Sequence, residues 1–370
     1  MNNNFKVKIF GDDTSNLFLA FLLLKKGFKV KILNKYNKSK NIHKEKFLFI
    51  SHSTKLILDN SNLWNQFKDR AYSIESLSLL DISILKKIDF SFNDLKFNKP
   101  SPNNLGWIVS NADLDDLLLN EISKFNDVFS SSNFKIDTEI KNSYNNLIAL
   151  NKNLNKKSFS SFFSKNKYSS VEFIASLRGY VHKRYYSIIN EYGFIFICPI
   201  NNNLFSVKWI IKKSLLERTL SFGKSFLLDN LSTIIPDELK IDQIIGSLNI
   251  TPFYPDILKG SSKKNFLIIS KGPVKLLDLR LEGLNLSFSE VIFIYNHVKK
   301  IDFKNKISYS FLKLKFFGLK FFKLKILNIF YELILMNNYF LYFLKSSFFY
   351  IFKKVIFLKK LLLKFIILIF

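Results

Sequence analysis

Apolar positions near the start of the chain fall into two short runs with a helical pattern between them. Residues 7–10 and 28–33 are the two runs, and residues 17–26 have apolar positions at helical spacing. Gly11 and Gly27 separate the three segments. This order predicts a strand, a turn, a helix and a second, parallel strand. It is the βαβ unit that places a dinucleotide pyrophosphate at a helix N-terminus.

The turn of this unit has the spacing of a glycine-rich fingerprint but few of its glycines. The three positions of a G-x-G-x-x-G pattern hold Gly11, Asp13 and Asn16, and Asn34 stands where an acid follows the second strand. The spacing predicts a Rossmann-type flavin or nicotinamide fold. Asp13 argues against tight cofactor binding, because like charges ~4 Å apart repel by about 4 kcal/mol at an effective dielectric near 20.

The middle of the chain has the pattern of β structure followed by a helix. Apolar runs at residues 194–197 and 204–211 flank a polar turn at residues 199–203, which predicts an antiparallel hairpin. Residues 214–231 predict one helix with Ser214 as its N-cap. The β-rich middle therefore interrupts the α/β pattern that opens the chain.

Further α/β segments follow this middle part. Residues 266–269 predict a buried strand and residues 284–295 a helix, whereas residues 89–104 predict a loop. We therefore expect an α/β fold in which a Rossmann-like domain is interleaved with an α+β substrate domain that has an antiparallel sheet. The expected boundaries are 1–70, 105–150 and 256–300 for the Rossmann-like domain, 71–104 and 165–255 for the substrate domain, and 301–370 for a basic helical tail.

The formal net charge of +27 raises the question of a nucleic-acid partner. Lysine outnumbers arginine about tenfold, and the other abundant residues are asparagine, phenylalanine, isoleucine and tyrosine. All of these have A/T-rich codons, whereas a nucleic-acid reader depends on arginine. We therefore attribute the charge to codon bias and expect no nucleic-acid partner.

Cysteine and histidine offer little chemistry in this sequence. Cys198 is the single cysteine, which excludes an intramolecular disulfide and a cysteine-based zinc site. Its apolar surroundings predict a buried, unreactive thiol. The four histidines have no metal-ligand spacing, and no secretory signal is visible, so we expect no metal and a bacterial cytoplasmic location.

The last sixty residues differ from the rest of the chain. Residues 311–370 contain eleven lysines and a single acid, Glu332, among phenylalanine, leucine, isoleucine and tyrosine. No charge-free run reaches the roughly 18 apolar residues of a spanning helix. The pattern fits a basic helix that lies on a membrane surface, here the inner membrane. A helical cap that packs on the core is the alternative.

Three further segments match one known pattern, in the same order as the βαβ unit. Residues 46–64 begin with a basic residue, Lys46, continue as an apolar run and end a helix at Trp64. Residues 105–114 have the pattern of a strand that leads into a helix start. Residues 266–286 follow the register G-D-A-A-H-x-x-x-P-x-x-G-Q-G-x-N. The matching positions are Ser270, Lys271, Gly272, Pro273, Val274, Asp278, Leu281, Glu282, Gly283, Leu284 and Asn285.

Together these segments resemble the flavin-dependent aromatic hydroxylases of ubiquinone biosynthesis, which are relatives of the hydroxybenzoate hydroxylases. The resemblance implies FAD as cofactor, NAD(P)H as reductant, and oxygen transfer from O₂ to a polyprenyl phenol that is delivered from the membrane. The nucleotide-binding part would then be an FAD-binding domain. The cofactor contacts that the resemblance implies are Gly11, Asp13, Asn34, Lys46, Lys271, Gly283 and Asn285.

Departures from the family pattern leave two interpretations open. Lys271 reverses the charge of a family aspartate, and Ala112 lacks the polar group that the family has at its position. The chain is therefore either a flavin-dependent monooxygenase or a catalytically degenerate relative. The latter would act as a membrane-associated scaffold for other ubiquinone-biosynthesis proteins. We identify no catalytic side chain, because in this family the flavin performs the chemistry.

Overall fold

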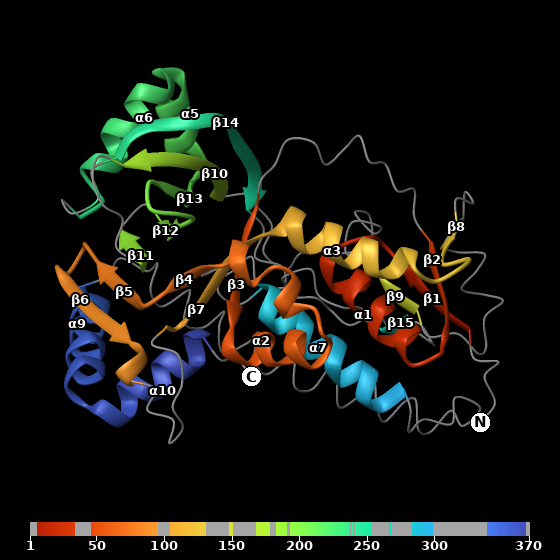
Figure 1. Cartoon of the computed structure of the whole chain (residues 1–370). Helices are drawn as coiled ribbons and strands as arrows, with labels where there is room; N and C mark the ends of the chain where they lie inside the picture. Colours follow the sequence, from red (N-terminus) through yellow and green to blue (C-terminus); the bar gives the residue numbers. More distant parts are fainter. Residues whose placement is uncertain are drawn as a thin grey trace.

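Three β-sheets organise the chain (Figure 1). The computed structural model describes residues 6–33, 46–94, 104–130, 148–150, 168–177, 183–190, 193–236, 239, 241–253, 266–267, 283–298 and 339–367.

A five-stranded parallel sheet contains the start of the chain. Its strand order is β15-β9-β1-β2-β8, and every neighbouring pair is parallel. The predicted βαβ unit is confirmed, because Val7 in β1 lies opposite Val30 in β2. The five strands are β1 (Lys6–Phe10), β2 (Lys29–Leu33), β8 (Phe129–Ser130), β9 (Ile148–Leu150) and β15 (Phe266–Leu267).

Helix α1 (Thr14–Lys25) is enclosed by this sheet and two other helices. Every residue from Thr14 to Leu24 is buried, so α1 lacks the polar face of an ordinary surface helix. The helices that pack on it are α3 (Asn111–Ser123) and α7 (Gly283–Val298). Phe18 stacks on Phe288 of α7 with ring centroids 4.3 Å apart. The first helix therefore depends on a segment that lies far along the chain.

A three-stranded antiparallel sheet follows, with the order β3-β7-β4. A Cβ on Gly106 would lie 2.3 Å from the Phe49 ring, so β3 and β7 approach as closely as they do because residue 106 is glycine. The hydroxyl of Ser51 accepts a hydrogen bond from the Thr54 N–H and caps α2. The elements are β3 (Phe47–Ser51), α2 (His52–Asn60), the 3₁₀ turns η2 (Trp64–Gln66) and η3 (Lys68–Arg70), β4 (Tyr72–Ile74) and β7 (Gly106–Ser110).

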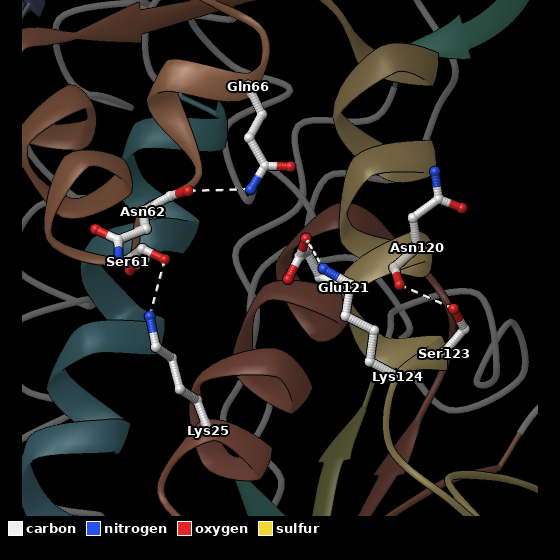
Figure 2. A network of polar contacts seen from close by, with 8 residues as sticks. All are labelled: Lys25, Ser61, Asn62, Gln66, Asn120, Glu121, Ser123 and Lys124. Carbon is white, nitrogen blue, oxygen red and sulfur yellow. Dashed lines mark hydrogen bonds and ion pairs between the residues drawn. The ribbon is translucent and has the colours of Figure 1, made fainter.

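The C-terminal ends of α1 and α2 are joined by a lysine. Lys25 Nζ donates to the Ser61 carbonyl oxygen at 3.1 Å (Figure 2). A cation at a helix C-terminus meets the negative end of the helix dipole and a carbonyl without an intrahelical partner. Lys124 pairs with Glu121 at 2.5 Å in the same region, at the end of α3. The Lys25 contact therefore ties the C-terminal end of α1 to that of α2, whereas the Lys124–Glu121 pair lies within the end of α3.

A seven-stranded mixed sheet contains the β-rich middle, in the order β14-β10-β13-β12-β11-β5-β6. The predicted hairpin is confirmed: β12 and β13 are antiparallel, with Ile195 opposite Trp209. The loop expected from residue 89 onward begins later, because residues 89–91 belong to β6 and Phe90 is buried. The strands are β5 (Ser76–Asp81), β6 (Lys86–Ser91), β10 (Tyr168–Leu177), β11 (Arg184–Asn190), β12 (Gly193–Pro199), β13 (Leu204–Lys212) and β14 (Ile241–Phe253).

The single helix expected over residues 214–231 is wrong in two respects. The segment forms α5 (Lys213–Ser221) and α6 (Gly223–Ser232), and Lys212, not Ser214, is the N-cap. Gly223 has a φ of +92°, a left-handed conformation that ends one helix and allows the next to start in a new direction. Leu216, Leu227 and other apolar residues of the two helices pack on one face of the seven-stranded sheet.

Two helices of the tail lie beside β6, namely α9 (Tyr339–Lys354) and α10 (Ile356–Ile367) (Figure 1). Phe349, Leu362 and Leu363 are buried in the same apolar cluster as Phe90. Lys359 pairs with Asp94, in the short turn η4 (Phe92–Asp94), at 2.9 Å. The tail therefore packs on the core through one face. Within the described ranges, every helix is too short or too polar to cross a membrane.

The sheets divide the sequence in the alternating manner that was expected, but the residue boundaries of the domains remain a prediction. The parallel sheet takes strands from the first 150 residues and from residues 266–267. The seven-stranded sheet takes strands from residues 76–91 and 168–253.

Candidate functional site

The candidate site begins at the turn between β1 and α1. Gly11 is buried and has a φ of +104°, which a side chain rarely tolerates, so a glycine is required here. Asp13 is the N-cap of α1, with φ −73° and ψ 156°, and its side chain makes no capping hydrogen bond. These are angles of ordinary extended backbone, so the conformation at position 13 does not require glycine. A glycine here would only leave more space for a bound anion and remove a negative charge beside it.

Three helix N-termini meet at this turn. The Thr14 hydroxyl of α1 donates to Asn111 Oδ1 at the start of α3, at 3.1 Å. The Ser15 hydroxyl donates to the Ser287 hydroxyl in the first turns of α7, at 2.7 Å. Helix N-termini carry a partial positive charge and N–H groups that lack intrahelical partners. Their convergence makes this junction electrostatically suited to an anionic ligand.

Asn285 connects α7 to the three-stranded sheet. Its Oδ1 accepts hydrogen bonds from the Ser51 N–H at 3.0 Å and from the Thr54 hydroxyl at 2.6 Å. Its Nδ2 donates to the Phe49 carbonyl oxygen at 3.1 Å. The side chain is buried among these partners. Asn285 therefore positions the start of α7 through its side chain.

Lys46 lies next to the same junction. Its carbonyl oxygen accepts a hydrogen bond from the Asn111 N–H at 2.7 Å, and its side chain is exposed. Asn111 in turn is bonded to Thr14, so a continuous chain of contacts leads from Lys46 to the N-terminal turn of α1. A lysine in this place can supply a point charge to a phosphate.

Five of the seven expected cofactor residues are thus brought together from three separate parts of the sequence. They are Gly11, Asp13, Lys46, Gly283 and Asn285. Asn34 and Lys271 lie outside the described residues.

Six small polar residues that hold the junction were not predicted from the sequence. They are Thr14, Ser15, Ser51, Thr54, Asn111 and Ser287. Ser51 and Asn111 have a visible signal, because each lies where a buried strand passes directly into a helix. Ser15 and Ser287 have none, because nothing local in the sequence shows that two serines 272 positions apart are in contact.

His52, the first residue of α2, borders the junction and was also missed. Its Nε2 lies 2.8 Å from the Asn104 carbonyl oxygen, and its ring meets Trp107 edge-on with centroids 4.9 Å apart. A carbonyl oxygen can only accept, so Nε2 carries the hydrogen and Nδ1 of the neutral ring is an acceptor. Burial lowers the pKa of His52; the Asn104 hydrogen bond raises it, and the charge of Lys55 lowers it further.

The lowered pKa of His52 predicts how the stability of the protein changes in acid. Unfolded His52 takes up a proton near pH 6.5, whereas the folded ring stays neutral to a lower pH, so the unfolded state binds more protons between the two values. We therefore expect the free energy of unfolding to fall as the pH drops below about 6.5. Urea unfolding at a series of pH values measures this dependence. Below about pH 6.5 the unfolding free energy of His52→Gln should fall less steeply with pH than that of the wild type. An equally steep fall in both proteins would show that His52 does not cause the loss of stability.

Within the described part of the chain, no group of three histidine, cysteine, aspartate or glutamate side chains could hold a metal ion. Cys198 is a buried free thiol in β12, as predicted.

Comparisons with known proteins add information about the fold. No protein-family model matches this chain, and no curated protein sequence does either. The structure of pqsL, a probable FAD-dependent monooxygenase from Pseudomonas aeruginosa, matches with a TM-score of 0.67 and 10% identity, over 90% of this chain and 96% of that one. The flavin-dependent halogenase CmlS matches with a TM-score of 0.66 and 15% identity, over 97% of this chain and 68% of that one.

A third solved structure, the flavin-dependent brominase Bmp2, matches with a TM-score of 0.65 and 13% identity, over 98% of this chain and 93% of the brominase. At these identities the similarity establishes the fold. The chain has the mixed α/β fold of the FAD-dependent monooxygenases and halogenases, as expected from its sequence.

Proposed function

We propose that this chain is a flavin-dependent monooxygenase that binds FAD and takes electrons from NAD(P)H. The observation that carries the proposal is the meeting of the α1 and α7 N-terminal turns, where the Ser15 and Ser287 hydroxyls lie 2.7 Å apart. In the sequence, α1 lies near the beginning and α7 near the end of the Rossmann-like part. Their N–H groups offer a dinucleotide one positive contact for its pyrophosphate and a second for its flavin end.

The residues at the junction fit FAD in most respects. Gly11 keeps the left-handed turn, Asn285 holds the start of α7, and Lys46 can place a positive charge near a phosphate. Asp13 is the exception, because its carboxylate stands at the N-cap of α1 where the pyrophosphate would lie. We expect binding that is weaker than the fold alone would allow.

Bound FAD supplies the reduction by NAD(P)H and the activation of O₂. The protein's own contribution is to orient the substrate ring and to exclude water. His52 follows Ser51 at the border of the junction, and its Nδ1 acceptor is of the kind that can take a hydrogen bond from a phenol.

For the substrate we propose a polyprenyl phenol of ubiquinone biosynthesis. The support is the resemblance of four segments of the sequence to aromatic hydroxylases that act on such phenols.

Asp13 supports a second candidate function, a scaffold for other ubiquinone-biosynthesis proteins that has lost the cofactor. A carboxylate at the N-terminus of a helix satisfies the dipole that a pyrophosphate would otherwise meet. Under this proposal the fold persists while the flavin does not bind.

A flavin titration of the purified full-length chain separates the two candidates. The monooxygenase proposal expects saturable quenching of FAD fluorescence at one FAD per chain, followed by NAD(P)H oxidation that a polyprenyl phenol accelerates. Isotopically labelled O₂ should then leave one labelled oxygen in the product. A folded chain that neither binds FAD nor oxidises NAD(P)H contradicts this proposal and favours the scaffold.

A further inference from the structure

Helices α9 and α10 present two different faces. The inner face is fastened to the core by the buried side chains of Phe349, Leu362 and Leu363 and by the Lys359–Asp94 pair at 2.9 Å. The side chains of that ion pair are about one-fifth exposed, so both lie partly under cover. The orientation of the two helices is therefore set, and their other face points away from the seven-stranded sheet.

The outer face is unusually apolar for a protein surface. Of the fifteen large hydrophobic side chains that are exposed among the described residues, eight lie within residues 339–367. Phe343 and Phe357 are each 70% exposed, and Ile356 is 68% exposed. Large exposed apolar side chains gathered on two neighbouring helices are typical of an interaction site. We call these eight residues the outer tail face: Phe343, Leu344, Tyr350, Ile351, Val355, Ile356, Phe357 and Leu361.

The charges that border the outer tail face have one sign. Lys353 and Lys354 are exposed between Ile351 and Val355, and Lys360 is half-buried next to Leu361. Residues 339–367 contain no aspartate or glutamate. The surface is therefore complementary to a partner that is apolar inside and negatively charged outside.

These features favour one class of partner over the others. A second copy of the chain would bring the same lysines against each other, and a nucleic acid would leave the exposed phenylalanine and isoleucine side chains in water. A bilayer with anionic headgroups satisfies both the lysines and the apolar residues. Helix α9 has 16 residues and α10 has 12, shorter than the roughly 20 that a spanning helix needs, so both would lie in the interface.

We propose that the outer tail face binds the surface of an anionic phospholipid bilayer. The side chains around the α9–α10 junction, Ile356 and Phe357 above all, enter the acyl region, and Lys353 and Lys354 contact the headgroups. Binding does not depend on a flavin, so this proposal stands or falls separately from the proposed function.

Vesicle co-sedimentation of the full-length chain tests this proposal. The wild-type chain is expected to sediment with phosphatidylcholine vesicles that contain phosphatidylglycerol, and at least about tenfold less with pure phosphatidylcholine. The double variant Ile356→Ser with Phe357→Ser should bind the anionic vesicles at least about tenfold less tightly, because it removes two exposed apolar anchors. Lys353→Glu with Lys354→Glu should have an effect of similar size.

Matched substitutions elsewhere serve as controls. Phe222→Ser removes a phenylalanine that is 61% exposed between α5 and α6, away from the tail. Lys212→Glu with Lys213→Glu makes the same charge change at another pair of adjacent lysines. Both controls are expected to bind vesicles within about twofold of the wild type, and all variants should keep the wild-type unfolding midpoint and FAD affinity.

Three results would overturn the proposal. The first is equal binding to neutral and anionic vesicles. The second is equal loss in the tail variants and their controls. The third is sedimentation of the wild-type chain without vesicles that is abolished in the double variant Ile356→Ser with Phe357→Ser. That result would identify the outer tail face as a contact between copies of the chain.

Discussion

Asn285→Ala is expected to lower the free energy of unfolding by about 3 to 5 kcal/mol. The substitution removes a buried amide that makes three hydrogen bonds, to the Ser51 N–H, the Thr54 hydroxyl and the Phe49 carbonyl. Each buried polar group left without a partner costs about 1 to 3 kcal/mol. Urea unfolding of the full chain, followed by far-UV circular dichroism, measures the loss.

Two further variants make this prediction specific. Thr54→Val removes one of the three hydrogen bonds of Asn285 at nearly constant volume, together with the bond that the Ser51 hydroxyl donates to Thr54, and about 1 to 2 kcal/mol is expected. Asn296→Ala makes the same asparagine-to-alanine change at an exposed position of the same helix, and should cost about 0.5 kcal/mol or less. If Asn285→Ala and Asn296→Ala cost the same, Asn285 does not hold α7 against the sheet.

Asp13→Gly is expected to tighten FAD binding by about tenfold. The carboxylate at the α1 N-cap stands where a pyrophosphate would meet the helix dipole, and two unit charges ~4 Å apart repel by about 4 kcal/mol at an effective dielectric near 20. Asp13 is partly exposed, although its Oδ1 is buried, so solvent reduces this repulsion to about 1 to 2 kcal/mol. Fluorescence titration with FAD measures the change.

Charge and space are separated by two related variants. Asp13→Asn removes only the charge, and we expect it to recover most of the gain if repulsion dominates. Asp12→Asn makes the identical charge change one residue earlier, outside the fingerprint position, and should shift the affinity less than about threefold. Equal affinities for the wild type and Asp13→Gly would mean that the pyrophosphate does not lie at this turn.

The sequence predicted the parts of the fold that depend on local pattern. The βαβ unit and the β12–β13 hairpin were recognised because alternation, glycine positions and turn residues act over a few positions. The break at Gly223 was missed because a helical apolar pattern continues on both sides of it, and the positive φ of a glycine leaves no trace in that pattern.

The site was predicted only in part, for a different physical reason. Gly11, Asp13 and Gly283 could be placed because a known spacing marks them. The partners of Asn285 could not, because Ser51 and Thr54 lie more than 230 positions away and no periodicity links them. The sequence of the tail left two alternatives open, because lysine stems and aromatic rings suit both a packed helix and a membrane surface. The structure distinguishes the inner face of the tail from the outer one by the burial of Phe349 and Leu363.

The burial of α1 on all sides has a consequence for how this protein is made. Part of the helix's cover is α7, which begins more than 250 residues later and contacts it through Phe288 and Ser287. During translation the first helix therefore leaves the ribosome long before its partner and stays incompletely packed. A contact between segments so distant in sequence forms slowly, and it prolongs the time for which apolar surface is exposed. Nascent chains of this protein should depend on chaperones until residue 298 has emerged.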